Sequence, residues 1–596
     1  MSARSAESNG SQARRPRRGP ALDRRAFIGC TTASLALACA QPSPRPPNIV
    51  LVITDDQGYG DLACHGNPVL RTPRLDRFHA ESVRFTDFHV DPLCAPTRAA
   101  LLTGRYAYRT GVTAAYAGRS ILRRDETTLA ELLSANGYGT GLFGKWHLGD
   151  NWPYRPNERG FDETVACWSG GVTQAADWWG NDYFDDTYYR NNVPEKFDGY
   201  CTDVFFDEGL RFIERNAHRP FFLFLPTNTP HAPYLVAERY SRPYAEMGIP
   251  EPRASFYGMI ENIDENFGRL RRKLGELGLE DNTILIFMTD NGSSAGWQDG
   301  FNAGMRAGKG SNYDGGHRVP FLIRWPEGGI GGGRDFDRLA AHIDVVPTLL
   351  ELTGAAAPDI DFDGVSLVPL LSGEGEFPED RTHFIQHQQV RRDGEYQMES
   401  PRPFYHSAVL TERWRLAGGE ELYDIRADPA QAQDLAAAHP EVVAGLRDEY
   451  ETWWEDVTSR FDEYLEIPVG AAEANPVRLT SFDWYTGGPP NQRVMADPPW
   501  DGPWADGFWA VEVVRAGRYR IRLRERPPVA NFPIDADSAH LAVDGQDLEA
   551  PVPRGATGVT FELDLSGGKK TLRAAFSKPG GLRRGACFAY VERLGP

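Results

Sequence analysis

Three continuous, largely apolar runs constrain the fold of this chain more than any other feature. They cover Asn48–Thr54, Pro220–Leu225 and Thr283–Met288. Runs of this kind are typical of strands that are buried on both faces of a sheet. Segments with helical character, among them Thr127–Asn136 and Phe256–Leu277, lie between them. The alternation predicts an α/β fold with a mostly parallel sheet between helices.

Polar residues follow two of these strands directly. Asp55 and Asp56 come after the first strand, and Asp290 and Asn291 come after the third. Because sites in open α/β sheets gather at the carboxyl ends of the strands, we expect these side chains to meet there. Their oxygens are hard ligands that suit Ca²⁺ or Mg²⁺ and do not separate the two ions. Helix capping or turn formation is the alternative role for Asp and Asn after a strand.

The pattern changes towards the C-terminus. Residues 376–460 contain short strand patterns and one helix, Pro440–Trp454, which indicates a small α+β subdomain. Residues 470–596 contain segments such as Phe508–Val514 and Val559–Leu565, in which apolar and polar residues alternate. This period is typical of half-exposed antiparallel strands, and it predicts an added β-sandwich.

Charge and composition argue against several classes of protein. The 596 residues carry a formal net charge of −19, although residues 1–47 are basic, with eight Arg against Glu7 and Asp23. An acidic surface of this size argues against nucleic-acid binding, which needs clustered Lys and Arg. Beyond the N-terminus no apolar run approaches the roughly 20 residues of a membrane helix. The seven Cys include no Cys-x-x-Cys pair, which excludes a disulfide scaffold and a Cys-type zinc site.

The first 39 residues have the features of an export signal. A basic stretch, Arg14–Arg25, precedes a weakly apolar stretch, Ala26–Ala40. Across their junction, Asp23–Ile28 resembles a twin-arginine signal, which carries folded cargo. Residues 40–47 then form a Pro-rich, extended spacer. We therefore expect an exported protein in the periplasm or at the cell surface.

One segment of this signal bears on lipid attachment. Leu35–Cys39 resembles a lipoprotein processing site, in which Cys39 would be the lipidated residue. Its Leu lies one residue further upstream than in the usual pattern, and a plain cleaved signal with an incidental Cys is the alternative. A lipid anchor on Cys39 is the one contact with a membrane that we expect.

The segment Cys94–Gly104 carries the most specific signal in the chain. A lone Cys is most often a buried small hydrophobe. Here the string Cys-x-Pro-Thr-Arg-x-x-x-Leu-Thr-Gly resembles the signature of the formylglycine-dependent, arylsulfatase-like sulfatases of the alkaline phosphatase superfamily. The resemblance implies that a formylglycine-generating enzyme oxidises Cys94 to formylglycine, and that Arg98 orients the modified residue.

Further segments resemble the same family. Gly137–His147 is similar to its second signature, in which Lys145 and His147 face the active site. His231 and Lys309 match positions that bind the sulfate and its leaving-group oxygen. The chemistry is suitable, because Lys supplies a point charge for sulfate oxygens and His can move a proton near neutral pH. Outside such a pattern, a lone Lys or His is more often a surface or core residue.

The same resemblance implies a bound Ca²⁺, for which Mg²⁺ is the alternative, and it assigns five ligands. They are Asp55, Asp56, formylglycine at Cys94, Asp290 and Asn291. The resemblance also implies an alkaline phosphatase-like fold, with a catalytic domain over residues 48–375 and the family's C-terminal subdomain over 376–460. It does not extend to residues 470–596.

These assignments imply a sulfuric ester hydrolase. Hydrated formylglycine would attack sulfur with Asp290 as the base, while Lys145, Lys309 and the metal balance charge on the sulfate oxygens. His231 would protonate the departing alcohol, and His147 would accept a proton as sulfate is expelled. A Ser or Cys nucleophile lacks the second hydroxyl that expels sulfate, which is the physical reason for the modification.

The sequence contains fewer signals that indicate substrate specificity. His317 and Arg318 could place an extra cation near the substrate, and a loop ion pair is the alternative. Trp178 and Trp179 suit stacking on a sugar face, although aromatic residues in such a loop are as often core anchors. An exported enzyme with an appended β-sandwich favours a sulfated carbohydrate, or else an aryl sulfate, over a steroid or lipid. The β-sandwich could bind carbohydrate through residues such as Trp509, or dock against the catalytic domain.

Two other functions remain open. A phosphodiesterase or phosphonate monoester hydrolase of the same superfamily can use the same formylglycine, but Gly144–His147 favours a sulfatase. An exported glycan-binding protein with an unmodified Cys94 is the non-catalytic alternative. All of the expected site positions hold chemically competent residues, which argues against that alternative.

Overall fold

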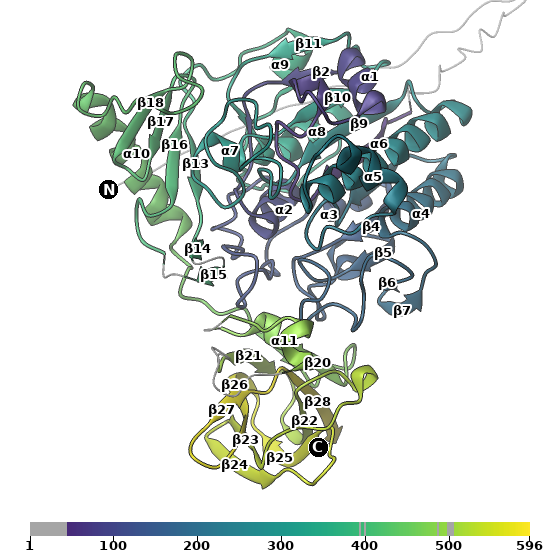
Figure 1. The fold of residues 1–596 in the computed structure, drawn as a ribbon, viewed down its shortest axis with the longest axis vertical. Helices are drawn as coiled ribbons and strands as arrows, with labels where there is room; N and C mark the ends of the chain where they lie inside the picture. Colours follow the sequence, from purple (N-terminus) through teal and green to yellow (C-terminus); the bar gives the residue numbers. More distant parts are fainter. Residues whose placement is uncertain (1–44, 393–394, 399–400, 486–487, 498–505, 596) are drawn as a thin grey trace, which may run out of the picture. The chain divides into compact units, whose positions relative to one another are not determined.

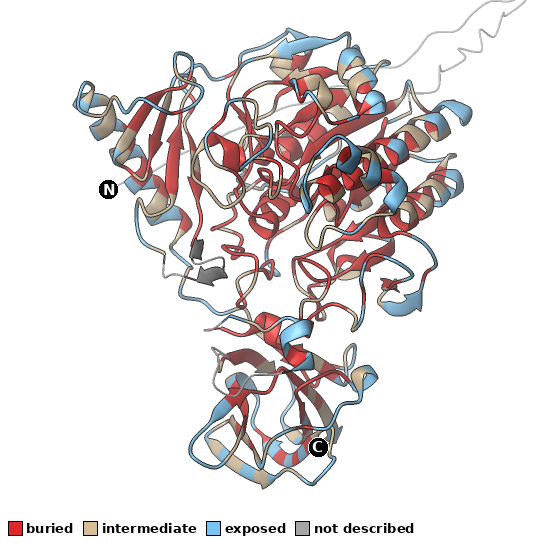
Figure 2. Cartoon of the chain, in the orientation of Figure 1, coloured by how far each residue is buried: buried red, intermediate tan, exposed pale blue. Residues whose placement is uncertain are grey.

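Strand β1 (Asn48–Thr54) lies inside a ten-stranded sheet, where the first apolar run was expected to form a buried strand. It pairs in parallel with β8 (Phe221–Pro226) on one side and with β9 (Thr283–Thr289) on the other. Every residue of these three strands is buried, and Figure 2 shows buried strands through the sheet. Their apolar composition therefore reflects cover on both faces of the sheet.

The computed structural model describes residues 45–596 apart from five gaps: 393–394, 399–400, 486–487, 498–505 and 596. The chain from Pro46 to Pro596 is one compact unit, so the expected boundaries between domains stay predictions. The expected export signal with Cys39, and most of the expected spacer, lie outside the described residues. Within the described part, no helix has both the length and the apolar character of a membrane span.

The strand order confirms the expected mostly parallel sheet. It is β11-β2-β10-β9-β1-β8-β4-β5-β6-β7, and the five strands from β9 to β5 are parallel to one another. Antiparallel pairs lie towards both edges, where β10 pairs with β9 and β6 pairs with β5. The other strands are β2 (Val83–Phe85), β4 (Gly139–Lys145), β5 (Glu163–Cys167), β6 (Thr187–Arg190), β7 (Val193–Lys196), β10 (Phe321–Arg324) and β11 (Arg334–Phe336).

Helices cover both faces of this sheet, as Figure 1 shows. Successive side chains of a strand point to opposite faces, so neighbouring residues of β1 enter different apolar clusters. Val50 shares a cluster with residues of α1 (Pro73–Glu81), α4 (Cys201–Asn216) and α6 (Arg253–Glu276). Leu51 shares another with residues of α2 (Cys94–Thr103), α3 (Leu129–Ala135) and α8 (Val345–Thr353). Shorter elements are β3 (Phe88–His89), α5 (Glu238–Glu246), α7 (Asp314–His317), β12 (Ala340–Ala341), α9 (Val368–Ser372), β14 (Gln389–Arg392) and β15 (Glu395–Met398).

A second sheet forms the α+β subdomain. Its four antiparallel strands are, in order, β13 (His383–Gln386), β16 (Ser407–Leu410), β17 (Trp414–Ala417) and β18 (Glu421–Asp424). Helix α10 (Pro440–Val457) packs on this sheet, where Tyr450 and Leu416 share one apolar cluster. The short strands and single helix expected for this region are therefore present.

Arg415, on β17, joins this subdomain to the main body of the chain. Its buried guanidinium donates from Nη2 to Asp87 Oδ1 at 2.6 Å and from Nε to Asp314 Oδ1 at 3.2 Å. Asp87 also forms a 2.9 Å bond with Nε2 of His89. Because a buried charge without a partner is costly, loss of Arg415 would leave both carboxylates in an unfavourable state.

The described residues between 467 and 595 form the expected β-sandwich. One sheet has the order β19-β21-β26-β23-β24, with β27 paired to β26, and the other has the order β20-β28-β22-β25. Trp484 and Trp509 are fully buried in their shared apolar core. Its described strands and α-helix are β19 (Ile467–Val469), β20 (Val477–Thr480), α11 (Gln492–Ala496), β21 (Phe508–Val513), β22 (Gly517–Arg524), β23 (Ser538–Val543), β24 (Gln546–Pro551), β25 (Val559–Leu565), β26 (Gly568–Ser577), β27 (Arg583–Gly585) and β28 (Phe588–Gly595).

We expect Arg415→Leu to lower the free energy of unfolding by about 3–5 kcal/mol, because it leaves Asp87 and Asp314 buried without their cation. Arg413, two residues earlier, is itself exposed and pairs with Asp424. Arg413→Leu should therefore cost less than about 1 kcal/mol. Urea denaturation of the two variants measures the difference, and equal costs would show that the buried network does not stabilise the fold.

Candidate active site

The carboxyl ends of neighbouring parallel strands bring the expected site residues together. β1 leads into Asp55 and Asp56, β9 leads into Asp290 and Asn291, and β4 ends at Lys145. In the sheet, β9, β1, β8 and β4 are successive neighbours and run parallel. Their carboxyl ends therefore share one edge of the sheet, where sites of this fold class form.

Four buried residues at this edge form what we refer to as the acidic cluster: Asp55, Asp56, Asp290 and Asn291. One oxygen from each of the three carboxylates lies within 4.8 Å of the others. The backbone N–H of Asp56 donates to Asp290 Oδ1 at 3.0 Å, and Asn291 Nδ2 donates to Asp56 Oδ1 at 3.0 Å. These bonds connect the ends of β1 and β9.

Each carboxylate of the acidic cluster has its own cation. Lys145 Nζ donates to Asp55 Oδ2 at 2.7 Å, and Lys309 Nζ donates to Asp56 Oδ1. Arg98 donates to Asp290 Oδ2 from Nη2 at 2.8 Å and from Nε at 3.2 Å. Because ionised groups are costly to bury without opposite charge, these pairs let the three carboxylates share a small volume.

The donor set fits a hard divalent cation. Among the described residues, Asp55 Oδ1 and Asn291 Oδ1 are buried oxygens without a hydrogen-bond partner. A buried acceptor that lacks a partner carries a free-energy cost, which a bound cation would remove. Carboxylate and amide oxygens are also the ligands that Ca²⁺ and Mg²⁺ prefer.

The pKa values of Asp56 and Asp290 are shifted in opposite directions. Burial opposes ionisation of Asp56 most strongly, but Lys309, His231 and Lys145 hold its pKa well below the usual range. Burial and the neighbouring charge of Asp55 raise the pKa of Asp290 to about 6, despite the pairing with Arg98. A positive charge in the cluster would favour the ionised form of Asp290.

Cys94 is the first residue of α2 and is 2% exposed. Burial raises the pKa of its thiol, although Lys145 and Lys309 act in the opposite direction. An unmodified Cys94 would therefore be a poor nucleophile, since the thiolate is the reactive form. Arg98 lies one helical turn further on, on the same face as Cys94, and its Nη1 also donates to the Lys145 carbonyl at 3.0 Å.

His147 is buried, and its two ring nitrogens differ. Nε2 lies 2.7 Å from the Ala115 carbonyl oxygen, to which it can only donate. Nδ1 is buried and has no hydrogen-bond partner among the described residues. Burial, followed by the charge of Lys145, lowers the pKa of His147 well below its ordinary value. The neutral ring therefore presents Nδ1 as a free proton acceptor.

His231 follows β8 and lies beside the acidic cluster. Its Nε2 is 3.7 Å from Asp56 Oδ2, and its Nδ1 lies 2.6 Å from the Ala232 carbonyl oxygen. The side chain is about one-fifth exposed, so a ligand can reach it. Burial is the largest cause that lowers the pKa of His231 to about 4.

Two glycines that no sequence motif singled out lie close to these histidines. A Cβ on Gly170 would clash with the ring of His147, and one on Gly171 would lie 3.0 Å from Cε1 of His231. The Gly-Gly pair, which follows β5, thus allows one turn of backbone to approach both rings closely. The only sequence signal for it was a glycine pair shortly after a strand.

The structure gives His317 and Arg318 contacts outside the acidic cluster. His317 is fully buried, and its Nδ1 lies 2.9 Å from Nδ1 of His89. Arg318 donates from Nε to the Thr86 carbonyl at 2.7 Å. His89, His317 and Asp314 also form a group with metal-ligand spacing, but Arg415 already supplies a positive charge to Asp314. The burial of His317 argues against direct substrate contact.

The two tryptophans singled out for sugar stacking are half-buried. Trp178 packs against the main core, with its ring centroid 6.3 Å from that of Tyr189. Trp179 packs against the core of the β-sandwich. Both therefore act as anchors in the structure, and their expected contact with a substrate stays a prediction.

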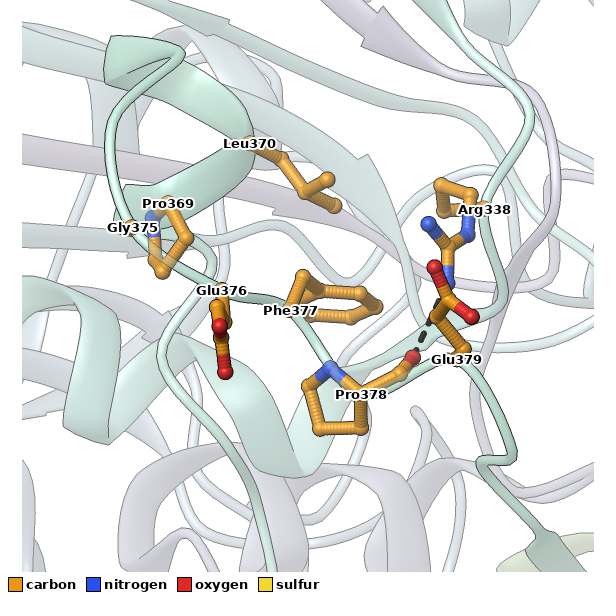
Figure 3. Close-up of a pocket in the computed structure, with 8 residues that line it drawn as sticks. All are labelled: Arg338, Pro369, Leu370, Gly375, Glu376, Phe377, Pro378 and Glu379. Atoms are coloured by element: carbon orange, nitrogen blue, oxygen red, sulfur yellow. Dashed lines mark hydrogen bonds between the residues drawn. The ribbon is translucent and has the colours of Figure 1, made fainter.

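A surface hollow, shown in Figure 3, lies around Arg338 and Phe377. Arg338 donates to the Pro378 carbonyl at 2.9 Å and to Glu412 Oε1 at 2.7 Å. None of the residues that line the hollow belongs to the acidic cluster or to the other expected site positions. Its cation is already paired, so the hollow is not a candidate active site.

The loop after β5 also holds a buried carboxyl group. Asp177 accepts hydrogen bonds from Thr173 N at 3.1 Å and from Asn181 Nδ2 at 3.1 Å. Burial and then the charge of Asp186 raise the pKa of Asp177 to about 8. The folded protein therefore keeps a proton that the unfolded chain has lost at neutral pH.

We expect Asp177→Asn to remove a pH dependence of stability. The raised pKa stabilises the fold at low pH, and that stability is lost as pH rises towards about 8. Between about pH 5 and pH 7.5, the free energy of unfolding should fall about 1.4 kcal/mol per pH unit more steeply in the wild type than in the variant. Urea denaturation at each pH measures both slopes. The exposed Asp182→Asn is the control, and identical slopes for wild type and Asp177→Asn would contradict the expectation.

Comparison with known proteins agrees with this geometry. The sulfatase family model matches residues 47–355, and the model for the C-terminal part of N-sulphoglucosamine sulphohydrolase matches residues 308–454. Human arylsulfatase A is 33% identical over 472 residues, which cover 69% of this chain and 89% of that protein. Human N-acetylgalactosamine-6-sulfatase is 35% identical over 369 residues, which cover 56% and 67%.

A solved structure extends the comparison to the fold. The crystal structure of Ps i-CgsB in complex with k-i-k-neocarrahexaose has a TM-score of 0.62 and 27% identity, and the match covers 70% of this chain and 95% of that one. Neither family model reaches the β-sandwich. The strand-end site, the paired carboxylates and these matches together show that the chain belongs to the sulfatase family of the alkaline phosphatase superfamily and is a sulfuric ester hydrolase.

Proposed function

We propose that this sulfatase removes sulfate from a hydroxyl group of a sulfated glycan, with formylglycine made from Cys94 and a bound Ca²⁺. The observation that carries the proposal is the position of Cys94 among the paired charges of the site. Lys145, Lys309, Asp55 and Asp290 all act on its thiol electrostatically. A modified residue at this position would meet both the metal ligands and the cations that suit a sulfate.

Asp55, Asp56, Asp290 and Asn291 would hold the Ca²⁺, with formylglycine at position 94 as a further ligand. The unpartnered buried oxygens of Asp55 and Asn291 support this assignment. The ligand types accept Mg²⁺ as well, and family resemblance is the reason for proposing Ca²⁺. When bound, the cation supplies positive charge that stabilises developing negative charge and lowers the pKa of a nearby hydroxyl.

Formylglycine, in its hydrated form, supplies a nucleophilic hydroxyl and a second hydroxyl through which sulfate can leave. Arg98 is suited to orient this residue, because its guanidinium is held by both Asp290 and the Lys145 carbonyl. Lys145 and Lys309 supply positive charge that can balance the negative charge of the sulfate oxygens.

The two histidines divide the proton transfers. His231 is neutral in the free enzyme, and the negative charge of a bound sulfate favours its protonated form. It can then donate to the departing alcohol oxygen, a contribution of about 10²–10⁴-fold for general acid catalysis. His147 accepts the proton of the second hydroxyl at Nδ1, because its Nε2–H is held by the Ala115 carbonyl.

Two relatives support a glycan substrate. One is human N-acetylgalactosamine-6-sulfatase, and the other is the structure that contains k-i-k-neocarrahexaose. Human arylsulfatase A, at similar identity, supports an aryl sulfate as a second substrate. The features of residues 1–39 support export to the periplasm or cell surface, and modification of Cys94 requires a formylglycine-generating enzyme as partner.

We expect Cys94→Ala to abolish hydrolysis of 4-nitrophenyl sulfate and of N-acetylgalactosamine 6-sulfate, because it removes the nucleophile. Mass spectrometry of the tryptic peptide Phe85–Arg98 from the native host should show sulfur replaced by oxygen with loss of two hydrogens. Cys587→Ala, which removes a buried thiol from the β-sandwich, is the matched control and should retain turnover. A Cys94→Ala enzyme that still releases sulfate would exclude the proposed nucleophile. Turnover of 4-nitrophenyl phenylphosphonate, a phosphonate monoester, without turnover of either sulfate ester would favour the phosphonate hydrolase alternative.

We expect Asn291→Ala to weaken Ca²⁺ binding by about 10-fold or more, since it removes one ligand oxygen from a rigid site. Isothermal titration calorimetry of Ca²⁺ into chelator-treated protein measures this without reference to activity. Ca²⁺ should also raise the melting temperature of the wild type, because it binds the folded state alone. Asp299→Asn, at an exposed carboxylate, is the control. Equal affinity in Asn291→Ala would place the metal elsewhere.

A further inference from the structure

The β-sandwich of residues 467–596 shares its apolar core with a loop of the catalytic region. We refer to residues 169–181, which follow β5, as the β5 loop. Its Ala175 and Ala176 are buried within the apolar cluster that holds Trp484 and Trp509 of the β-sandwich. The β5 loop therefore completes the sandwich core.

Gln492 of α11 binds the backbone of the β5 loop at successive points. It is 6% exposed, so its amide has almost no access to water. Its side-chain Nε2 donates to the carbonyls of Gln174 at 3.2 Å, Asp177 at 3.4 Å and Trp178 at 3.2 Å. Its Oε1 accepts from Gly180 N at 3.0 Å, and its backbone N–H donates to Thr173 O at 2.7 Å.

Arg478 of β20 adds a further bond to the same loop. Its Nη2 donates to the Ala176 carbonyl at 3.1 Å and to Asp150 Oδ2 at 3.4 Å. Buried backbone groups outside regular secondary structure need partners from elsewhere. For the β5 loop, Gln492 and Arg478 of the β-sandwich supply several of those partners.

The other end of the β5 loop contacts the active site. Gly170 and Gly171 lie against His147 and His231, so a shift of this backbone changes the space around both rings. Phe482 of the β-sandwich approaches from a second direction, with its ring centroid 5.8 Å from that of His147. Its carbonyl also accepts from Ala117 N at 3.1 Å, two residues from the Ala115 carbonyl that orients His147.

Sugar binding through Trp509 is not supported by these contacts. Trp509 is fully buried, and its Nε1 donates to the Thr480 carbonyl at 2.6 Å. Its indole has no free face for a sugar. The β-sandwich instead contacts segments of the catalytic region that lie next to His147 and His231.

We propose that the β-sandwich is a positioning domain of the active site, in which Gln492 holds the β5 loop and thereby keeps His147 and His231 in place for proton transfer. The proposal rests on the catalytic roles proposed above for the two histidines. Gln492 is a positioning residue, since it acts through Gly170 and Gly171 and touches neither ring. Displacement of catalytic groups by about 1 Å can cost about 100-fold in rate, so such a contact has a measurable effect.

The full-length Gln492→Leu variant tests this proposal, because Leu keeps the approximate volume and removes every side-chain hydrogen bond. Hydrogen exchange of residues 169–181 should become at least about tenfold faster as the loop opens locally. With 4-nitrophenyl sulfate, kcat should fall about tenfold or more while KM changes less than about threefold, since a small substrate is bound by the lysines and the metal. Ca²⁺ affinity should not change.

Further variants provide a control and additional tests. Arg493→Leu, at an exposed position on the same helix, should change neither exchange nor kcat. Gln492→Glu keeps the acceptor for Gly180 N but cannot donate to the three carbonyls, so it should resemble Gln492→Leu. If Gln492→Leu does not fold by circular dichroism, Phe482→Leu probes the second contact and should lower kcat in the same way.

Three results would overturn the proposal. They are faster loop exchange at unchanged kcat, a lower kcat at unchanged loop exchange, and no change in either. If wild-type enzyme that carries formylglycine hydrolyses neither 4-nitrophenyl sulfate nor N-acetylgalactosamine 6-sulfate, the result would count against the proposed sulfatase mechanism. Hydrogen exchange, which does not depend on turnover, would in that case still report whether Gln492 holds the loop.

Discussion

Three buried carboxylates at one edge of a parallel sheet are the constraint on which the rest of this structure depends. Ionised groups are expensive to bury, and each needs a compensating charge close by. The pairs are Asp55 with Lys145, Asp56 with Lys309, and Asp290 with Arg98. Their cations come from β4, a distant loop and α2, so the charge requirement brings segments from across the catalytic region to the ends of β1 and β9.

The same requirement explains how the α+β subdomain is attached, whereas the β-sandwich is held mainly in another way. Arg415 of the α+β subdomain reaches two carboxylates of the main body, where an unpaired charge would be destabilising. The β-sandwich has one such ion pair, between Arg478 and Asp150, but Gln492 also satisfies loop carbonyls and Trp484 helps to form a core around Ala175 and Ala176. The first attachment is mainly electrostatic, and the second combines hydrogen bonds with apolar burial.

Several features could be predicted from residue patterns alone. The run that became β1 was apolar throughout because both of its faces are covered, and Asp55 and Asp56 had to lie at its carboxyl end. No such physical pattern pointed to Arg98 or Lys145, which were identified from the resemblance of their motifs to those of the sulfatase family. The position of His317 in the chain suggested a cation near the substrate, but its ring is buried and lies against that of His89. No local sequence pattern distinguishes a histidine that faces substrate from one that is buried in the core, because burial depends on elements that are distant in the chain.

The sequence by itself determined the mostly parallel sheet, the placement of carboxylate and amide side chains after its strands, the β-sandwich and the sulfatase family, since these depend on periodicity and on contiguous motifs. Only the tertiary structure decided which cation pairs with which carboxylate, that Gly170 lies close to His147 and Gly171 close to His231, and that Gln492 binds the loop to which both glycines belong. The physical reason is that these contacts join residues that are tens to hundreds of positions apart. Their energies depend on close packing and exact hydrogen-bond distances, which a linear pattern does not encode.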